Sequence, residues 1–251
     1  MKKIITLLGL AAFAFVSQAV AAEKGFKSIF DGKTLDGWDG DPKFWSVEDG
    51  SITGKTTKEN PTKGNTFIIW NGGKTGDFEL RLDYKIVGGN SGIQYRSFKL
   101  KNGADQWRVG GYQADIDSGP TYSGICYGEA FRGILSLRGK KTILQVAEDG
   151  KLKKSVEEFS KDADVAKAVK NEKWNSYRIV ARNFNLTQYI NGVKTTQVID
   201  RDKKTRRADG LLALQLHAGP PMKVQFKNIR IKELAKRKSK AGAAKKGEAK
   251  K

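Results

Sequence analysis

Short segments in which apolar and polar residues alternate recur along this chain, and Gly, Asn and Asp lie between them. Successive side chains of a β-strand point to opposite faces, so such a segment buries one face and leaves the other polar. We predict strands at 66–70, 78–86, 93–98, 112–116, 133–137, 142–146, 176–181, 186–190, 193–198, 211–217 and 224–231. Many short strands with turn residues between them predict an all-β protein, and we expect a two-sheet antiparallel jelly-roll sandwich.

Local signals refine this picture. Asn191-Gly192 lies between two predicted strands, and Asn-Gly is the strongest short signal for a tight hairpin. Within 224–231 the two-residue alternation of apolar residues is interrupted between Phe226 and Ile229, which indicates a bulge near Asn228. Residues 155–170 follow a helical period, so we predict one short helical insertion between strands.

Three predicted strands each place polar residues on one face. These residues are Gln94 and Arg96 in the first strand, Gln113, Asp115 and Asp117 in the second, and Gln215 and His217 in the third. If the three strands share a sheet, with that face outward, the residues form one wet surface that suits a polyhydroxylated ligand. His217 is the only histidine and precedes a loop that Pro220 and Pro221 stiffen.

A structural interpretation stays open for each candidate. Alternation alone is typical of any half-buried antiparallel strand. Asp117 begins a turn sequence and can simply cap a loop. Arg96 can form an ion pair across the sheet, and His217 can hydrogen-bond its own loop. Glu129 and Arg132 follow a Gly-rich loop, where they either reach the rim of the site or form a solvated pair.

The two ends of the chain differ from its middle. Residues 1–22 combine a basic start, a short apolar run and small residues at 19–21, which predicts a signal peptide and export to the periplasm or the medium. No other segment is long and apolar enough for a membrane span. With Cys126 as the only cysteine, no internal disulfide can form, and we expect a buried thiol.

Much of the net charge of +20 is concentrated in the C-terminal tail, since 232–251 holds nine Lys or Arg. Residues 234–251 are rich in Lys and Ala, lack apolar residues to bury, and are predicted to be disordered. This tail either contacts anionic envelope polymers or has no partner. We expect no nucleic-acid partner, because 23–233, the predicted single domain, shows no nucleic-acid-binding motif.

Several motifs match one family in order. They are Gly25-Phe-Lys-Ser-Ile-Phe-Asp-Gly-Lys-Thr-Leu-Asp-Gly-Trp38, Asn90-Ser-Gly-Ile-Gln-Tyr-Arg96, Gly111-Tyr-Gln-Ala-Asp-Ile-Asp117, Trp174-Asn-Ser-Tyr-Arg-Ile179 and Leu214-Gln-Leu-His-Ala-Gly-Pro-Pro-Met222. Over nearly the whole predicted domain the chain resembles the 3-keto-disaccharide hydrolase domain family. The resemblance implies a concanavalin A-like fold and cleavage of 3-keto-glycosides.

A ketone at C3 of a sugar acidifies the hydrogen at C2, so a base can remove that proton and the resulting enolate can expel the group at C1. Such a route needs a base, a group that stabilises the enolate oxygen, and an acid for the leaving oxygen. His217 can serve as base or acid. Asp115 or Asp117 can orient it, act as the base, or hold a divalent cation, and Arg96 can stabilise the enolate.

The remaining polar candidates are expected to bind substrate: Asn90, Gln94, Gln113, Asp117, Gln215, Glu129 and Arg132. No spacing of His and carboxylates identifies a metal set, so a required cofactor is not predicted and a divalent cation stays possible. Two other functions remain open, a non-catalytic carbohydrate-binding module that uses the same face, and an envelope-associated structural protein held by its basic tail.

Overall fold

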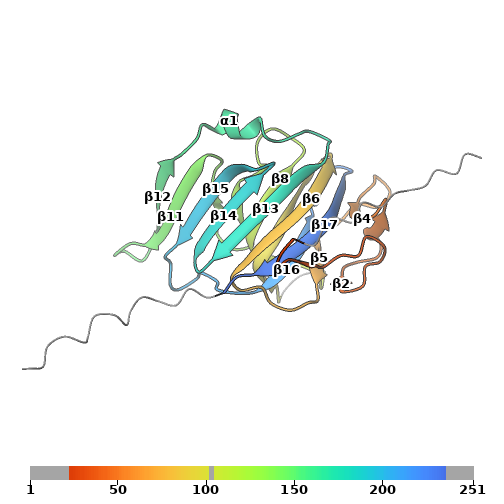
Figure 1. Cartoon of the computed structure of the whole chain (residues 1–251), viewed down its shortest axis with the longest axis horizontal. Helices are drawn as coiled ribbons and strands as arrows, with labels where there is room; N and C mark the ends of the chain where they lie inside the picture. Colours follow the sequence, from red (N-terminus) through yellow and green to blue (C-terminus); the bar gives the residue numbers. More distant parts are fainter. Residues whose placement is uncertain (1–22, 102–104, 236–251) are drawn as a thin grey trace, which may run out of the picture.

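The computed structural model describes residues 23–101 and 105–235 as two β-sheets packed face to face (Figure 1). The predicted signal peptide and residues 236–251 of the tail lie outside the described residues. The ten-stranded sheet has the order β12 (Leu152–Glu158), β11 (Lys140–Val146), β15 (Val193–Asp200), β14 (Asn185–Ile190), β13 (Asn175–Arg182), β6 (Phe78–Val87), β17 (Lys223–Glu233), β4 (Ser51–Lys55) and β3 (Trp45–Glu48), and β1 (Lys27–Ser28) pairs with β17.

The seven-stranded sheet has the order β10 (Gly133–Ser136), β9 (Cys126–Glu129), β8 (Val109–Asp117), β7 (Asn90–Lys99), β16 (Leu211–Leu216), β5 (Thr66–Trp70) and β2 (Trp38–Asp39). This architecture confirms the predicted all-β sandwich. The pairs are antiparallel except for β11 with β15, where Lys140 lies opposite Thr196 in a parallel register.

The core lies between the sheets and is built by the apolar halves of the alternating strands. Leu212, Leu214 and Leu216 of β16 point inward and are buried, while Ala213 and Gln215 lie on the opposite face. Removing a leucine side chain from water contributes about 1.5–3 kcal/mol, so the inward phase of such a strand is strongly fixed. One face of each strand is therefore committed to the core, and the other is left for a site.

Two turn predictions are confirmed by the backbone. Asn191 and Gly192 both have positive φ, 48° and 83°, as a tight hairpin between β14 and β15 requires. Asn228 has φ 52°, and the register of β17 against β6 shifts between Lys227 and Arg230, which is the predicted bulge.

The predicted helix over 155–170 is mostly wrong. Its first part belongs to β12, which pairs with β11 along its whole length, and only α1 (Asp162–Ala166) is helical, at one end of the sandwich (Figure 1). The apolar residues that suggested a helix are divided between the two elements, since Val156 is exposed on the edge strand and Val165 is buried. Among the described residues, no helix has the length and apolar composition needed to cross a bilayer.

Candidate functional site

The three strands predicted to share a polar face are neighbours in the seven-stranded sheet. In the pairing of β7 with β8, Gln94 lies opposite Gln113 and Gly92 lies opposite Asp115. In the pairing of β16 with β7, Ala213 lies opposite Gln94. The polar phases of the three strands therefore coincide on the outer face of one sheet, as predicted.

That face is not the open wet surface predicted from the sequence. Gln94 and Gln215 are fully buried and do not line the cavity beside Asp115, so their predicted contact with a ligand there is wrong. Ser97 Oγ donates to Gln94 Oε1 at 2.8 Å, and Gln94 Nε2 donates to Gln113 Oε1 at 2.5 Å. Gln113 Nε2 also donates to Gln215 Oε1 at 3.4 Å, while Gln215 Nε2 has no partner among the described residues. The three amides therefore form a buried layer beneath the site instead of its surface.

Gly92 allows this layer to reach Asp115. A Cβ at Gly92 would lie 2.5 Å from Cδ of Gln113, so the glycine leaves the space in which the Gln113 side chain lies. From there Gln113 Nε2 donates to Asp115 Oδ1 at 2.6 Å. The series of donors that begins at Ser97 therefore ends on the Asp115 carboxylate.

A cavity of about 560 Å³ opens above Asp115, and we call it the cleft. It brings together six residues predicted from the sequence: Asn90, Gln113, Asp115, Asp117, Glu129 and His217. Its walls also include residues that the sequence analysis missed, namely Asn65, Arg108, Tyr122, Ile125, Tyr127, Ala130 and Ile134. Its volume falls in the range of ordinary small-molecule sites.

Asp115 is the most perturbed acid that lines the cleft. Its side chain accepts hydrogen bonds from Gln113 and, at 3.1 Å, from Asn90 Nδ2, and the residue is only 4% exposed. Burial raises the pKa of the Asp115 carboxyl to about 7, with smaller upward contributions from Asp117 and Glu129, although the two amide donors act in the opposite direction. The group can therefore gain or lose a proton near neutral pH.

His217 lines the same cleft at the end of β16. Its Nδ1 lies 2.5 Å from the carbonyl oxygen of Ala218, so Nδ1 carries the proton and a neutral ring keeps a lone pair on Nε2. Asn65 holds the loop in place, since its Oδ1 accepts from the Ala218 N–H and its Nδ2 donates to Glu129 Oε1, both at 3.1 Å. The loop contact expected as the structural alternative for His217 thus exists, and it leaves the second ring nitrogen available.

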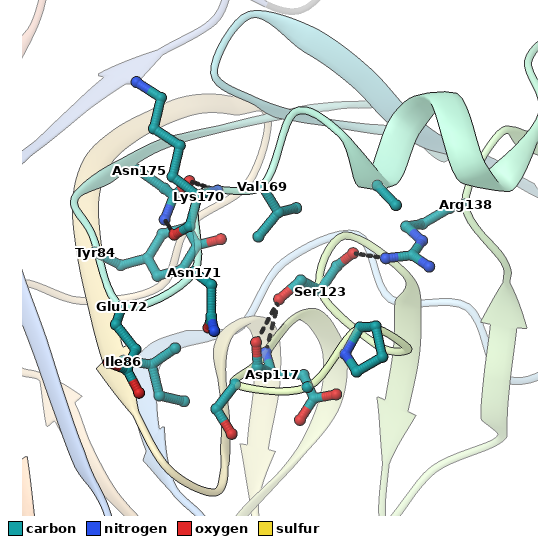
Figure 2. A pocket seen from close by; sticks show the side chains of 14 residues that line it. Tyr84, Ile86, Asp117, Ser123, Arg138, Val169, Lys170, Asn171, Glu172 and Asn175 are labelled. Atoms are coloured by element: carbon teal, nitrogen blue, oxygen red, sulfur yellow. Dashed lines mark hydrogen bonds between the residues drawn. The ribbon is translucent and has the colours of Figure 1, made fainter.

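Asp117 lies where the cleft meets a smaller cavity of about 280 Å³, which Figure 2 shows from close by. Its backbone N–H donates to Ser123 Oγ at 2.9 Å, and the Tyr122 N–H donates to its Oδ2 at 3.3 Å. Arg138 Nη1 contacts the Ser123 carbonyl oxygen at 3.5 Å. Asp117 therefore closes the loop 117–123, as its turn sequence indicated, and also forms part of the cleft wall.

The predicted place of Arg96 on the polar face is wrong. The register of β7 against β8 shifts between Tyr95 and Phe98, and Arg96 has φ 49°, so its side chain leaves the face that Gln94 occupies. Arg96 is fully buried, pairs with Asp77 at 3.0 Å and donates to carbonyl oxygens, including that of Gly76 at 2.9 Å. It holds loops together and does not reach the cleft.

Arg132 also does not line the cleft, so its predicted place at the rim is wrong. Its guanidinium pairs with Asp200, contacts the Tyr112 hydroxyl at 3.3 Å and lies 4.3 Å from the centre of the Phe131 ring. Tyr112 faces the core, as the alternation of β8 predicts. The opposite charge of Asp200 therefore fixes Arg132 within the protein, and Glu129 alone of the predicted loop pair reaches the cleft.

No signal in the sequence identifies Arg108 or Asn65 as site residues. Arg108 directly precedes β8, and Asn65 directly precedes β5, so each follows a loop whose path the alternation does not define. Tyr127 was detectable in principle, because its strand β9 lies beside β8 and places Tyr127 opposite Gln113. Within 23–101 and 105–235, no group of three or more His, Cys, Asp or Glu is placed to hold a metal ion.

Comparisons with known proteins agree with this architecture. The model of the 3-keto-alpha-glucoside-1,2-lyase-like domain family matches residues 25–232. A 3-keto-disaccharide hydrolase from Bacteroides thetaiotaomicron is 40% identical over 83 residues, which are 28% of this chain and 27% of that protein. The aligned segment thus spans about a quarter of that relative's length.

Solved structures share the fold at low sequence identity. A protein from Parabacteroides distasonis ATCC 8503, provisionally named a glycosyl hydrolase, has a TM-score of 0.52 at 20% identity, with 83% of this chain and 99% of that chain covered. A transglycosylase solved in complex with NAG has a TM-score of 0.50 at 13% identity, with 84% and 85% covered. Because the family model matches most of its length, this chain belongs to the family of 3-keto-alpha-glucoside-1,2-lyase-like domains.

Proposed function

We propose that this protein is an exported hydrolase that cleaves 3-keto-glycosides by elimination followed by addition of water. The observation that carries the proposal is a pair of proton-transfer groups in one cavity, the buried Asp115 carboxyl and the His217 imidazole. Membership of the family and the name of the Bacteroides relative support a carbohydrate substrate.

Asp115 is the proposed base. Two amide donors hold its carboxylate, and the lack of water around it raises its affinity for a proton, so it is a stronger base than an ordinary carboxylate. It takes the proton from C2 of the keto sugar, and the electrons of the broken C–H bond form the enolate with oxygen at C3. Arg108, which lines the cleft, takes the enolate-stabilising role predicted for Arg96, because its charge is permanent.

His217 is the proposed acid. In its charged form the ring donates the Nε2 proton to the leaving oxygen, the bond from C1 to that oxygen breaks, and a double bond forms between C1 and C2. Ala218 and Asn65 keep the ring oriented during this step. His217 then takes a proton from water as the water oxygen bonds to C1, and Asp115 returns its proton to C2. The net reaction is hydrolysis, and both groups regain their starting states.

Release of the leaving alcohol from a 3-keto-glucoside by the purified protein tests this mechanism. Asp115→Asn and His217→Gln are each expected to lower kcat by at least about a hundredfold. Asp83→Asn is the matched control, because Asp83 accepts a hydrogen bond from Asn228 on the other sheet and does not line the cleft. A plain glucoside should not react, because its C2 hydrogen is not acidified.

Activity that persists in both variants would remove the proposed roles of Asp115 and His217. If the wild-type protein turns over no keto sugar, with or without added divalent metal, but binds the sugar, the function is that of a carbohydrate-binding module. In that case either substitution would weaken sugar binding only moderately.

Export is part of the proposal and rests on residues 1–22, which resemble a cleavable signal peptide. Cell fractionation of the full chain, with mass spectrometry of its N-terminus, is expected to find a processed protein outside the cytoplasm. An unprocessed N-terminus in the cytoplasmic fraction would contradict it. Deleting 236–251 and measuring salt-dependent retention in the envelope tests whether the basic tail binds anionic polymers.

A further inference from the structure

A second cavity of about 600 Å³ adjoins the cleft, and Asn65 and Arg108 line both. The two hollows therefore meet at these two side chains. We call the second one the Trp107 cavity. Its other walls come from Asp41, Lys43, Phe44, residues 60–64, Thr66 and residues 105–107.

An aromatic surface forms one wall of the Trp107 cavity. The indole N–H of Trp107 donates to Asp39 Oδ1 at 2.7 Å, which fixes the ring, and its backbone N–H donates to Asp105 Oδ1 at 2.8 Å, which fixes the main chain. Phe44 adds a second ring. A fixed indole suits the apolar face of a sugar ring, because it offers a large contact area and loses little conformational freedom on binding.

Three of the described residues that line the same cavity have buried polar atoms without partners. Within the described part of the chain, the hydroxyl oxygens of Thr62 and Thr66 and the Nε of Arg108 are buried and have no hydrogen-bond partner. Thr66 is only 2% exposed. Buried polar groups are almost always paired, so three unpaired atoms on residues of one cavity point to a ligand that supplies donors and acceptors once these side chains turn toward it.

We propose that the Trp107 cavity binds the leaving sugar of a 3-keto disaccharide while the keto sugar occupies the cleft. The inference rests on the proposed function, because Asp115 and His217 fix which unit reacts. One hexose combines an apolar ring face for Trp107 with hydroxyls for Thr62, Thr66 and Arg108. The shared wall at Asn65 and Arg108 then lies near the glycosidic bond, and the protein is selective for disaccharides over glycosides with a small leaving group.

Kinetics with matched substrates test the proposal. The 3-keto derivatives of maltose and trehalose release glucose as the leaving group, whereas methyl 3-keto-α-glucoside releases methanol, and every substrate also yields the 3-keto sugar. Trp107→Ala is expected to lower kcat/KM for the disaccharides about tenfold and to change kcat/KM for the methyl glycoside less than about twofold. Trp174→Ala is the matched control, because that ring contacts Lys85 and Lys227 on the ten-stranded sheet.

Thr66→Val gives an answer that does not depend on Trp107. Valine keeps the shape of threonine and removes an unpaired buried hydroxyl, so the free energy of unfolding should hold or rise. The same variant should lose about three- to tenfold in kcat/KM for the disaccharides. Equal losses for the disaccharides and the methyl glycoside in both variants would overturn the proposal.

A binding measurement separates this inference from the proposed chemistry. Calorimetric titration with glucose and with unoxidised maltose should show binding to the wild-type protein that Trp107→Ala weakens and Trp174→Ala preserves. If no keto sugar is turned over but this pattern holds, the cavity is a sugar subsite and the chemistry is wrong. If Trp107→Ala binds both sugars as the wild-type protein does, or neither sugar binds, the assignment of the cavity is wrong.

Discussion

Replacing Asp115 with Asn is expected to abolish turnover and at the same time to stabilise the fold at neutral and alkaline pH. The carboxyl ionises near its ordinary value of 3.8 in the unfolded chain and near 7 in the folded protein, because folding buries it. Between these values the unfolded state releases a proton that the folded state keeps. The stability that Asp115 contributes is therefore complete below pH 3.8 and is lost as the pH rises toward 7.

The size of the effect follows from the displaced pKa. Each unit corresponds to about 1.36 kcal/mol, so ionising the buried group at high pH costs the fold about 4 kcal/mol. Between pH 5 and pH 8 the free energy of unfolding of the wild-type protein should fall by about 2.5 kcal/mol relative to Asp115→Asn. In Asp115→Asn the new side-chain NH₂ group faces the NH₂ donor of either Gln113 or Asn90. This loss of one hydrogen bond lowers the free energy of unfolding by about 1–2 kcal/mol at every pH.

Urea denaturation followed by tryptophan fluorescence, at intervals from pH 5 to pH 8, measures this difference. Asp83→Asn is the control substitution, because that carboxylate lies on the other sheet and keeps contact with water. A difference between the wild-type protein and Asp115→Asn that stays constant across this range would refute the argument that folding strips water from Asp115.

Three further results are expected. Arg96→Met leaves the Asp77 carboxylate without its buried partner and should lower the free energy of unfolding by about 3–5 kcal/mol in urea; a loss below about 1 kcal/mol would contradict the structural role of this pair. Gly92→Ala puts a methyl group 2.5 Å from Cδ of Gln113 and is expected to reduce kcat/KM about tenfold, because the methyl group displaces the Gln113 side chain. Unchanged kinetics would mean that the position of Gln113 is dispensable. The acid limb of the wild-type kcat/KM profile should lie near pH 7, where Asp115 ionises, and a limb near pH 4 would remove Asp115 as the base.

The sequence alone was sufficient for the fold class and for half of the site. Two-residue alternation predicts which strands exist and which face of each is buried, because the core tolerates only one phase. The same reasoning correctly placed Asp115, Gln113 and His217 on one side of one sheet. The alternation does not predict that the Gln94 amide is buried beneath these residues, because it shows which face a side chain is on but not how deeply that face is covered.

The errors have local causes. A bulge adds one residue to a strand, so the side chains beyond it point to the opposite faces from those that alternation predicts. Arg96 therefore matches the polar pattern in the sequence, but its side chain does not lie on the polar face. Residues 155–170 mix an edge strand with a short helix, and an edge strand with two exposed faces carries no clear period. Arg108 precedes its strand on a loop, where no period applies, and only the folded chain shows that it lines the cleft.

The way in which Asp115 is held also determines the stereochemistry of the proposed reaction. Gln113 and Asn90 each occupy one carboxylate oxygen from the protein side, so the lone pairs that remain face the cleft. A proton taken from C2 is therefore held against a single face of the planar enolate and returns to that same face. Turnover in D₂O should give a product that keeps the configuration of the substrate at C2 and carries deuterium there only where the Asp115 carboxyl exchanges its proton with solvent before returning it. No sugar epimeric at that carbon should accumulate.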